Sequence, residues 1–305
     1  MSIFRSFKTF KNGIENWFSV ALNMFILKRD TDCKIKNIGT VKLKKGKNYL
    51  NSSLFRTLVF SNQNNLNNEQ WTILRNSFET IDDNVITVRN IEDGNEFKFQ
   101  NKCLDVVFET FIRKEYKNIG YAENKTLIDV GANVGDTAIY FANKGYTVYA
   151  FEPLPNVCDI ALKNISLNPQ IKDKIKFINK ACSCKNGFIT LNYDDEETSV
   201  FTSEFIKAKK TIEVETITIE DILEEYNIKP CILKIDCEGC EVGIIQNTDL
   251  SMFDEIIFEF HTFLTKFNEK KLIALLEKQG FELNEINYHD KGYGIIHMIN
   301  LKKDK

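Results

Sequence analysis

The sequence is poor in several features that would mark particular classes of protein. Its 305 residues include only 4 Pro and 3 His, and its formal net charge is −3 at pH 7. A charge this small gives no global field that would attract nucleic acid. Hydrophobic residues make up 43% and charged residues 27% of the chain. These values are ordinary for a globular protein and exclude a fully disordered chain and a multi-pass membrane protein.

The sequence also lacks a clean signal peptide, which bears on its 8 Cys. Residues 17–27 are largely apolar, but Ser19 and Asn23 interrupt them and no small-residue cleavage site follows. A chain of this length can build a core without disulfides. Cys237 and Cys240 have a spacing found in metal sites, although a structural zinc site usually takes two matching pairs. We therefore predict a cytoplasmic protein with reduced, buried thiols and no bound metal.

The first 120 residues are predicted to form an appendage of one helix and short strands. Apolar residues recur every three or four positions over residues 4–27, which predicts a helix packed on the protein's own body. Its other face is basic, so peripheral contact with a membrane surface is the alternative. Alternation predicts a strand over residues 35–43, and Asp93-Gly94 predicts a hairpin within residues 84–100. Helical spacing returns in residues 103–118.

Residues 121–305 are predicted to form one α/β domain. Apolar runs alternate with segments of helical spacing, which indicates a mostly parallel sheet with helices on both faces. The last two strands, over 281–288 and 293–301, are joined by a connection so short that they must be antiparallel. The predicted strands and helices between residues 126 and 278 are strands at 126–130, 147–151, 175–181, 231–236 and 255–261, and helices at 137–143, 157–167, 219–226, 242–246 and 272–278.

The most informative segment is an apolar strand followed by a glycine turn and a helix start, over residues 127–137. Gly131 allows a sharp turn, and Gly135 allows close backbone approach. The pattern lacks the second glycine of a dinucleotide fingerprint and the Lys of a P-loop. Asp136 places a carboxylate at the helix start, which disfavours a polyphosphate ligand and suits a cationic one.

Glu152 ends the next strand, about 20 residues after the glycine turn. Nucleoside-binding α/β folds place an acid there to hold the ribose hydroxyls, and one carboxylate can accept from both hydroxyls. The alternative is an acid that merely stabilises the start of the following helix. The glycine turn and the acid together favour a nucleoside ligand.

Five stretches in order and spacing resemble the FkbM family of S-adenosylmethionine-dependent methyltransferases. They are Leu127-Ile-Asp-Val-Gly-Ala-Asn-Val-Gly-Asp136, Ala150-Phe-Glu-Pro-Leu-Pro155, Lys163-Asn-Ile-Ser-Leu-Asn168, Leu233-Lys-Ile-Asp-Cys-Glu-Gly239 and Ile256-Ile-Phe-Glu-Phe-His261. The resemblance implies a class I methyltransferase, a Rossmann-like fold whose sheet ends in an antiparallel pair. Cys237 and Cys240 depart from the family pattern, which leaves a redox or metal role open.

The resemblance also implies roles for individual residues. The residues expected to bind S-adenosylmethionine are Asp129, Gly131, Ala132, Asn133, Gly135, Asp136, Thr137, Glu152, Pro153, Ala181 and Cys182. Asp236 would lie where the methyl group and the acceptor meet, and Glu238 would shape the loop after it. With His261, which ends the neighbouring strand, these two residues are the candidate catalytic residues. Within the first group, Glu152 would hold the ribose, and Ala181 and Cys182 would lie beside the adenine.

A hydroxyl acceptor must lose a proton, and the sequence leaves the proton acceptor open. His261 ends a strand beside the one that carries Asp236, and a histidine with an ordinary pKa of about 6.5 suits a base near neutral pH. The alternative is a histidine hydrogen-bonded at a strand end. Asp236, Glu238, Glu259 and His261 together could also bind a hard divalent ion, which is the less favoured interpretation.

We therefore expect an S-adenosylmethionine-dependent methyltransferase. The resemblance implies O-methylation of a sugar, glycan or other small metabolite. A nicotinamide-dependent dehydrogenase and a cofactor-binding module without catalysis are the alternatives.

Overall fold

The computed structural model describes residues 14–23, 27, 29–36, 39–43, 66–79, 85–193, 202–203, 210–229 and 231–302. The chain divides into two compact units, Met1–Asn118 and Ile119–Lys305, and each is described by itself. The predicted domain boundary lies two residues away, at 120/121; the assignment of the two parts as domains stays a prediction. In the described residues, no helix has the length and apolar character needed to cross a membrane.

The first unit contains short helices and two hairpins. Its elements are α2 (Trp17–Ala21), β1 (Thr31–Ile35), β2 (Gly39–Leu43), α4 (Asn68–Glu79), β3 (Val85–Arg89), β4 (Glu96–Gln100) and α5 (Leu104–Phe111), with a 3-10 turn over Asn101–Cys103. The β3–β4 hairpin confirms the prediction for residues 84–100. The rings of Phe97 and Phe99 pack against Phe111 on α5, with centroids 5.3 and 5.4 Å apart.

Three predictions for this unit are corrected. Residues 35–43 are not one strand, because β1 ends at Ile35 and β2 begins at Gly39 and runs antiparallel to it. The predicted helix over residues 4–27 is not continuous, because Ile14 forms an isolated bridge with Ile35 and α2 begins only at Trp17. Residues 4–13 of that prediction lie outside the described residues. The predicted helix over 103–118 is shorter and ends at Phe111.

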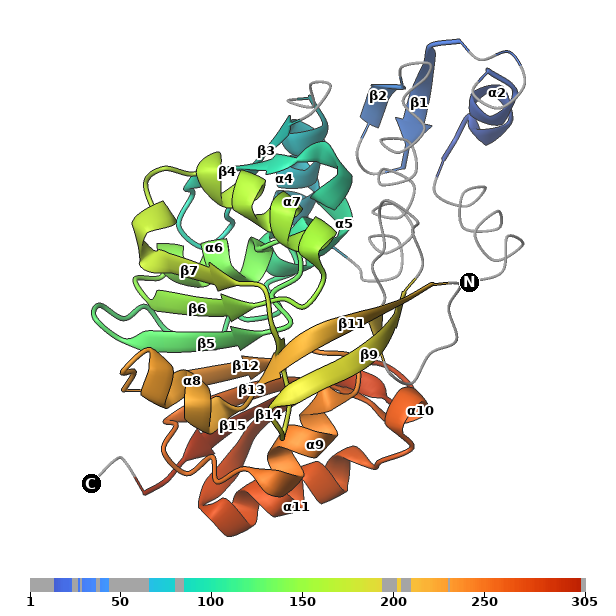
Figure 1. Ribbon diagram of the computed structural model, residues 1–305. Coiled ribbons are helices and arrows are strands. Elements are labelled where there is room, and N and C mark those ends of the chain that lie inside the picture. Colours follow the sequence, from blue (N-terminus) through green and yellow to red (C-terminus); the bar gives the residue numbers. More distant parts are fainter. Residues whose placement is uncertain are drawn as a thin grey trace. The chain divides into compact units, whose positions relative to one another are not determined.

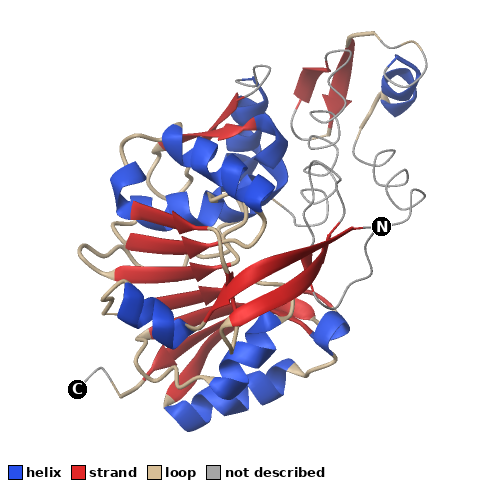
Figure 2. Cartoon of the chain, viewed as in Figure 1, coloured by secondary structure: helices blue, strands red, loops and turns tan. Residues whose placement is uncertain are grey.

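The second unit is built on a sheet in the order β14-β15-β13-β12-β5-β6-β7 (Figures 1 and 2). Its strands are β5 (Thr126–Val130), β6 (Thr147–Phe151), β7 (Ile175–Ile178), β12 (Ile232–Ile235), β13 (Glu255–His261), β14 (Phe281–Asp290) and β15 (Tyr293–Asn300). The five strands from β13 to β7 are parallel. β15 is antiparallel to both β13 and β14, which confirms the predicted terminal pair.

Helices cover both faces of this sheet. They are α6 (Asp136–Asn143), α7 (Pro155–Ser166), α8 (Ile219–Glu225), α9 (Cys240–Asn247), α10 (Thr262–Thr265) and α11 (Glu269–Gln279), with a 3-10 turn over Lys172–Lys174. Residues of α8, α9 and α11 share one buried cluster with β12 and β13. The chain moves outward from β5 to β7 and then in the other direction from β12 to β13. Because such crossovers are right-handed, α6 and α7 lie on the face opposite α8 and α9.

This reversal of direction places a switch point between the neighbouring strands β5 and β12. In open α/β sheets, ligands bind beyond the carboxyl ends of the strands at such a point. The apolar runs of β5 and β12 are buried on both faces, as expected for central parallel strands. The fold therefore points to the loops after β5, β6, β12 and β13 as the candidate site.

A second, smaller sheet has the order β10-β9-β11-β8. Its strands are β8 (Ala181–Cys182), β9 (Gly187–Tyr193), β10 (Thr202–Ser203) and β11 (Lys210–Ile217). The sequence predicted one strand over residues 175–181 with Ala181 and Cys182 at its end. That prediction is wrong: β7 ends at Ile178, and Ala181 and Cys182 pair in parallel with β11.

Candidate active site at the carboxyl ends of the strands

The glycine turn after β5 contacts both the end of β6 and the loop after β12. Gly131 has φ +76°, and a Cβ at this position would collide with the backbone carbonyl of Asp236 in the loop after β12. The N–H groups of Gly131 and Ala132 both donate to the carbonyl of Phe151 at 2.9 Å. Gly131 is therefore required by a close approach as well as by its backbone conformation.

The same turn ends in the helix α6. Gly135 is the N-cap of α6 with φ +79°, and Asn133 also has a positive φ of 45°. A Cβ on Gly135 would lie 3.3 Å from the Cβ of Ala161 on α7. Gly135 thus allows α6 and α7 to pack closely.

Glu152, the residue after β6, is buried and folded back over this turn. One of its carboxylate oxygens accepts the N–H of Asn133 at 3.1 Å and the other accepts the N–H of Leu154 at 2.9 Å. Burial raises the pKa of Glu152 from 4.5 to about 7, although these two backbone hydrogen bonds oppose the shift. Glu152 and Asn133, 19 positions apart in the sequence, therefore meet at this turn.

Lys234 is a central residue that the sequence analysis missed. It lies on β12 with 1% of its side chain exposed, and its ammonium is 2.9 Å from the buried carboxylate of Asp129 and 3.9 Å from Asp236. It also donates to the carbonyl of Gly131 at 3.0 Å. Burial alone would lower the pKa of Lys234, but Asp129 and Asp236 raise it above its usual value.

This ion pair changes the predicted charge of the site. Asp129 also accepts a hydrogen bond of 2.6 Å from the hydroxyl of Thr137. The carboxylate of Asp129 is therefore paired with Lys234 and Thr137 within the protein. The sequence predicted that the carboxylate of Asp136 would suit a cationic ligand, and Asp129 on β5 and Asp236 after β12 add two further carboxylates. Lys234 offsets part of that charge. A lysine inside the otherwise apolar run 231–235 was the available signal.

The remaining negative charge gathers around His261, the last residue of β13. The Nε2 atom of His261 lies 3.1 Å from Glu238 and 3.3 Å from Glu259, and Nδ1 lies 3.9 Å from Glu241. His261 is 1% exposed and Glu241 is fully buried. The predicted residues Asp236, Glu238 and His261 are thus brought together, with one atom of each within 4.8 Å of the others.

The pKa values in this cluster depart from those of isolated side chains. Burial would lower the pKa of His261, but Glu241 and Glu259 raise it to about 11. Burial raises the pKa of Glu238 to about 8, against the attraction of His261. Burial and Asp236 raise the pKa of Glu259. Burial would also raise the pKa of Asp236, but Lys234, a hydrogen bond with Glu259, and the charges of His261 and His289 together lower it. The ordinary histidine pKa that suggested a base does not apply here, because these carboxylates hold His261 as an imidazolium.

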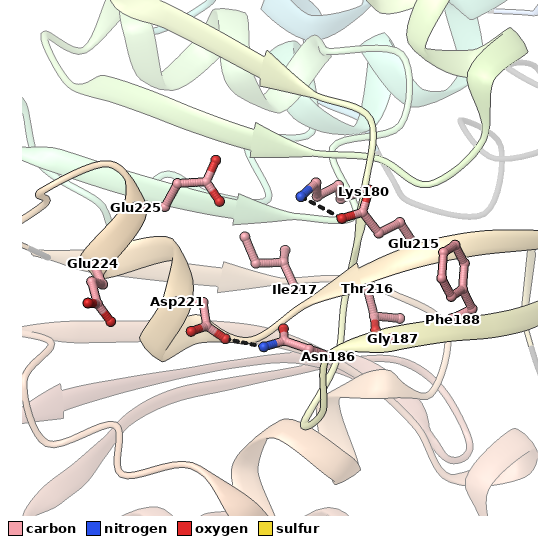
Figure 3. Close-up of a pocket in the computed structure, with 10 residues that line it drawn as sticks. All are labelled: Lys180, Asn186, Gly187, Phe188, Glu215, Thr216, Ile217, Asp221, Glu224 and Glu225. Carbon is pink, nitrogen blue, oxygen red and sulfur yellow. Dashed lines mark hydrogen bonds and ion pairs between the residues drawn. The ribbon is translucent and has the colours of Figure 1, made fainter.

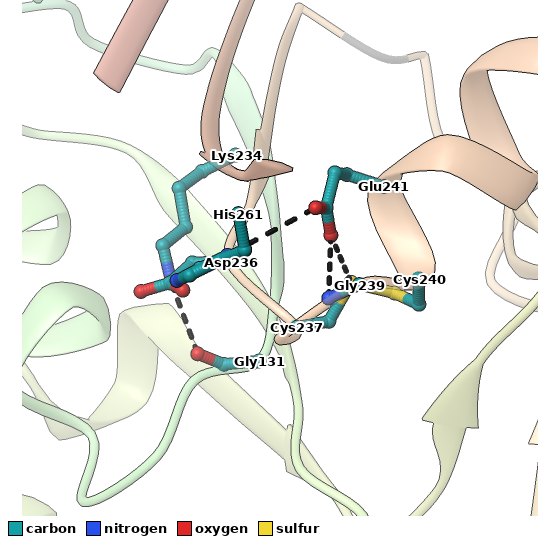
Figure 4. The surroundings of a disulfide bond; sticks show 8 residues. All are labelled: Gly131, Lys234, Asp236, Cys237, Gly239, Cys240, Glu241 and His261. Carbon is teal, nitrogen blue, oxygen red and sulfur yellow. Dashed lines mark hydrogen bonds and ion pairs between the residues drawn. A yellow bond between two sulfur atoms is a disulfide. The ribbon is translucent and has the colours of Figure 1, made fainter. Parts of the chain in front are cut away.

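Cys237 and Cys240 form a disulfide that closes the loop after β12 (Figure 4). The prediction that all cysteines are reduced thiols is therefore wrong for this pair. The two Cα atoms lie 5.4 Å apart, because Glu238 and Gly239 both take positive φ and turn the chain back. The other six cysteines are free. The disulfide lies beside the cluster around His261, since Glu241 accepts the N–H of Gly239 at 2.8 Å.

A pocket of about 540 Å³ lies elsewhere on this unit (Figure 3). It is lined by the start of β9, the end of β11 and helix α8, and its ion pair joins Lys180 to Glu215 at 2.8 Å. None of the predicted site residues lines it. The predicted adenine neighbours Ala181 and Cys182 are buried in the adjoining β8. Ala132 is also buried and Pro153 is half-buried, beside Glu152 in sequence.

The model of the methyltransferase FkbM domain matches residues 129–283, just over half of the chain. No curated protein matches the sequence. The match begins at Asp129 and includes the glycine turn, Glu152, the loop after β12 and His261.

Solved structures of methyltransferases resemble the chain with low identity. Methyltransferase FkbM from Methylobacillus flagellatus KT is 11% identical with a TM-score of 0.43, covering 64% of this chain and 53% of its own. Magnesium protoporphyrin IX methyltransferase from Synechocystis PCC 6803, solved with bound SAM, is 12% identical with a TM-score of 0.41, covering 66% of this chain and 83% of its own. This chain thus spans about half of the Methylobacillus protein. On the strength of the family match, the chain belongs to the FkbM methyltransferase domain family.

Proposed function

We propose that this chain transfers a methyl group from S-adenosylmethionine to a hydroxyl group of a sugar, glycan or other small metabolite. The observation that carries the proposal is that Glu152, folded over the glycine turn, and the cluster of Asp236, Glu238 and His261 both lie at the carboxyl ends of the parallel strands. The first group suits a nucleoside and the second suits a hydroxyl that must lose a proton.

The residues around the glycine turn fit S-adenosylmethionine. Each carboxylate oxygen of Glu152 accepts one backbone N–H and keeps a further lone pair, so the pair of oxygens can still accept two vicinal ribose hydroxyls. Asp236 lies beyond the end of β12 and carries a lowered pKa, so an anionic carboxylate would be available to stabilise a sulfonium bound there. When bound, this cofactor supplies an electrophilic methyl group.

The residues around His261 fit a polar acceptor. The side chains of Asp236 and Glu238 are 30% and 21% exposed, whereas that of His261 is 1% exposed. A substrate can therefore reach the two carboxylates, while His261 lies behind them and holds Glu238 by an ion pair. We assign proton acceptance to the carboxylates and a positioning role to His261. Alignment of the acceptor with the methyl group would supply the larger part of the rate, about 7–11 kcal/mol for well-oriented groups.

The alternatives have less support. A nicotinamide-dependent dehydrogenase is not favoured by the family match and lacks the second glycine of the turn. A binding module without catalysis would not need several buried acids around one histidine, because burying such charges costs free energy.

Calorimetry with the demethylated cofactor tests the nucleoside part of the proposal. Glu152→Ala should weaken binding by about 1.5–3 kcal/mol, the range for hydrogen bonds to a charged group. Glu255→Ala, at the opposite end of the sheet, is the matched control and should bind as the parent does. Equal affinity in the Glu152 variant and the parent would remove the assignment of Glu152.

Label transfer tests the reaction. A cell extract is incubated with the protein and methyl-labelled cofactor, and mass spectrometry identifies the molecules that gain the label. The proposal expects the label on an oxygen of a polyhydroxylated acceptor. A label on nitrogen or carbon would contradict O-methylation and leave the methyltransferase assignment in place.

A further inference from the structure

We propose that Asp236, Glu238 and His261 form a binding site for a divalent cation of the Mn²⁺ or Mg²⁺ class. Each residue offers one ligand atom, and these three atoms lie within 4.8 Å of one another. Ligand atoms on opposite sides of a cation are separated by two bond lengths, about 4–5 Å for bonds of about 2.0–2.6 Å. The three side chains therefore need only small adjustments to bind one ion.

The charges around the three residues support a cation. The carboxylates of Glu259 and Glu241 also face His261, at 3.3 and 3.9 Å. The ammonium of Lys234 is closer to Asp129 than to Asp236, at 2.9 against 3.9 Å. Four carboxylates, those of Asp236, Glu238, Glu241 and Glu259, thus gather around His261, while Lys234 and His289 act on Asp236 as further positive groups. A divalent ion would offset this surplus charge in a setting where burial makes it costly.

A second observation concerns the buried ring of His261. Its Nε2 atom points to Glu238 and Glu259, whereas its Nδ1 atom has no hydrogen-bond partner among the described residues. The facing atom, Oε1 of the fully buried Glu241, has none there either, and the 3.9 Å between them is too long for a hydrogen bond. Figure 4 shows this pair and Asp236 close by.

This arrangement matches a known requirement of metal-binding histidines. A histidine that binds a metal through one nitrogen usually donates the other N–H to a carboxylate, which fixes its tautomer. Glu241 is held in place for that role by the N–H of Gly239, at 2.8 Å. A shift of less than an ångström would form the Nδ1–H to Glu241 hydrogen bond. Binding of the ion would then displace the Nε2 proton of the imidazolium to solvent, which leaves the Nε2 lone pair for the ion.

The ligand atoms also indicate which ions fit. Two carboxylates and one imidazole suit a hard or borderline ion such as Mn²⁺, with water completing its coordination. The nearby sulfurs of Cys237 and Cys240 are joined in a disulfide, so they are not thiolate ligands for a soft metal. The described residues around His261 therefore do not form a mixed cysteine–histidine zinc site.

The catalytic consequence rests on the proposed function, whereas ion binding itself does not. An ion at Asp236 and Glu238 would lie at the more exposed side of the cluster, where the acceptor is assigned. Coordination lowers the pKa of a bound hydroxyl and positions it. An acceptor with two adjacent oxygens, such as a vicinal diol of a sugar, would chelate the ion and gain most from it.

The test is a titration of the whole 305-residue chain, freed of metal with a chelator, with Mn²⁺. Electron paramagnetic resonance monitors the titration, because the signal of free Mn²⁺ decreases when the ion binds. We expect a single ion per chain. Asp236→Asn and Glu238→Gln should each weaken binding at least tenfold, and Glu241→Gln should weaken it by about 10–100-fold through the orientation of His261. Glu255→Gln, at the His297 pair, is the matched control and should bind as the parent does.

The outcomes separate the two proposals. The cation site would be overturned if the free-ion signal did not decrease at millimolar Mn²⁺. It would also be overturned if Asp236→Asn and Glu238→Gln bound Mn²⁺ as tightly as the parent. Circular dichroism checks that each variant is folded, and three variants at different positions keep the test decisive if one is not. Calorimetry with the demethylated cofactor runs on the same samples. Cofactor binding without Mn²⁺ binding refutes only the cation site, and Mn²⁺ binding without cofactor binding refutes only the proposed function.

Discussion

The two ends of β13 each bring a histidine next to a glutamate, yet the surroundings differ. At the amino end, His297 of β15 has both ring nitrogens engaged, with Glu255 at 2.8 Å and Asn284 at 2.9 Å. At the carboxyl end, His261 faces three glutamates and has one nitrogen without a hydrogen-bond partner in the described residues. The first site is satisfied within the protein, and the second is not.

This difference indicates where the fold tolerates charged groups that lack partners. A buried polar group without partners costs free energy, so a structural site tends to pair every atom. The pair of His297 and Glu255 follows that rule. The cluster around His261 departs from it at the switch point of the sheet, where ligands bind. An excess of carboxylates there is expected of a site that receives a ligand, and the pairing at the other end is expected of a site that only stabilises the fold.

Replacing the two histidines should give the largest contrast. His261→Ala should lower turnover about 10–100-fold, the range for a residue that orients a functional group, because Glu238 loses its ion-pair partner. His297→Ala should leave turnover within about twofold of the parent and lower only stability. Single-turnover rates with labelled cofactor measure both. If the two variants lose activity equally, the distinction between the two ends is wrong.

Removing Lys234 should give the next largest effect, on stability. Lys234→Met leaves the buried carboxylate of Asp129 without its cation, which should lower the free energy of unfolding by about 3–5 kcal/mol. Lys180→Met is the matched control, because its ion pair with Glu215 is partly exposed and should contribute about 1 kcal/mol or less. Urea unfolding measures both. A small effect in the Lys234 variant would show that Asp129 is protonated or hydrated.

Opening the disulfide should have a smaller effect. Cys237→Ser with Cys240→Ser removes a link between residues 3 positions apart, and closing so short a loop contributes about 2 kcal/mol in the chain-entropy description. Cys184→Ser, a change at a free and half-buried cysteine, is the control and should cost less. Urea unfolding of oxidised samples compares them. Equal stability of the double variant and the parent would show that the link does not constrain the unfolded chain.

The features of the fold that the sequence predicted correctly are those fixed by the residues of a single strand or helix. The strands β5, β6 and β13 have the predicted bounds, because each is an apolar run with a polar or glycine residue at its end. The strand predicted over residues 35–43 instead runs across the turn between β1 and β2, since alternation continues on both sides of that turn. Alternation reports which residues face one side and does not report where the chain reverses.

The parts of the site that were not predicted depend on partners from distant segments. The choice of Asp236 and His261 as neighbours followed from the order of the strands. The ionisation state of His261 did not, because it depends on Glu241, whose carboxylate returns to the site through the closed loop after β12. Lys234 was overlooked for the same reason: its partner Asp129 lies on a different strand, 105 positions away. Periodicity alone carries no information on such pairs.

The smallest expected effect concerns the pH dependence of cofactor binding at Glu152. Its pKa of about 7 in the folded protein is raised above the ordinary 4.5, mainly by burial. The contribution of this group to stability is therefore complete below pH 4.5 and is lost as the pH rises through about 7. Cofactor binding should follow the opposite course, because only the ionised carboxylate accepts from both ribose hydroxyls. Affinity for the demethylated cofactor should rise about tenfold between pH 6 and pH 8, as the ionised fraction rises by about that factor.

Calorimetry at several pH values measures this rise, and Glu152→Gln, which keeps the shape but cannot ionise, should remove it. The same rise in the Glu152→Gln variant would assign the pH dependence to another group.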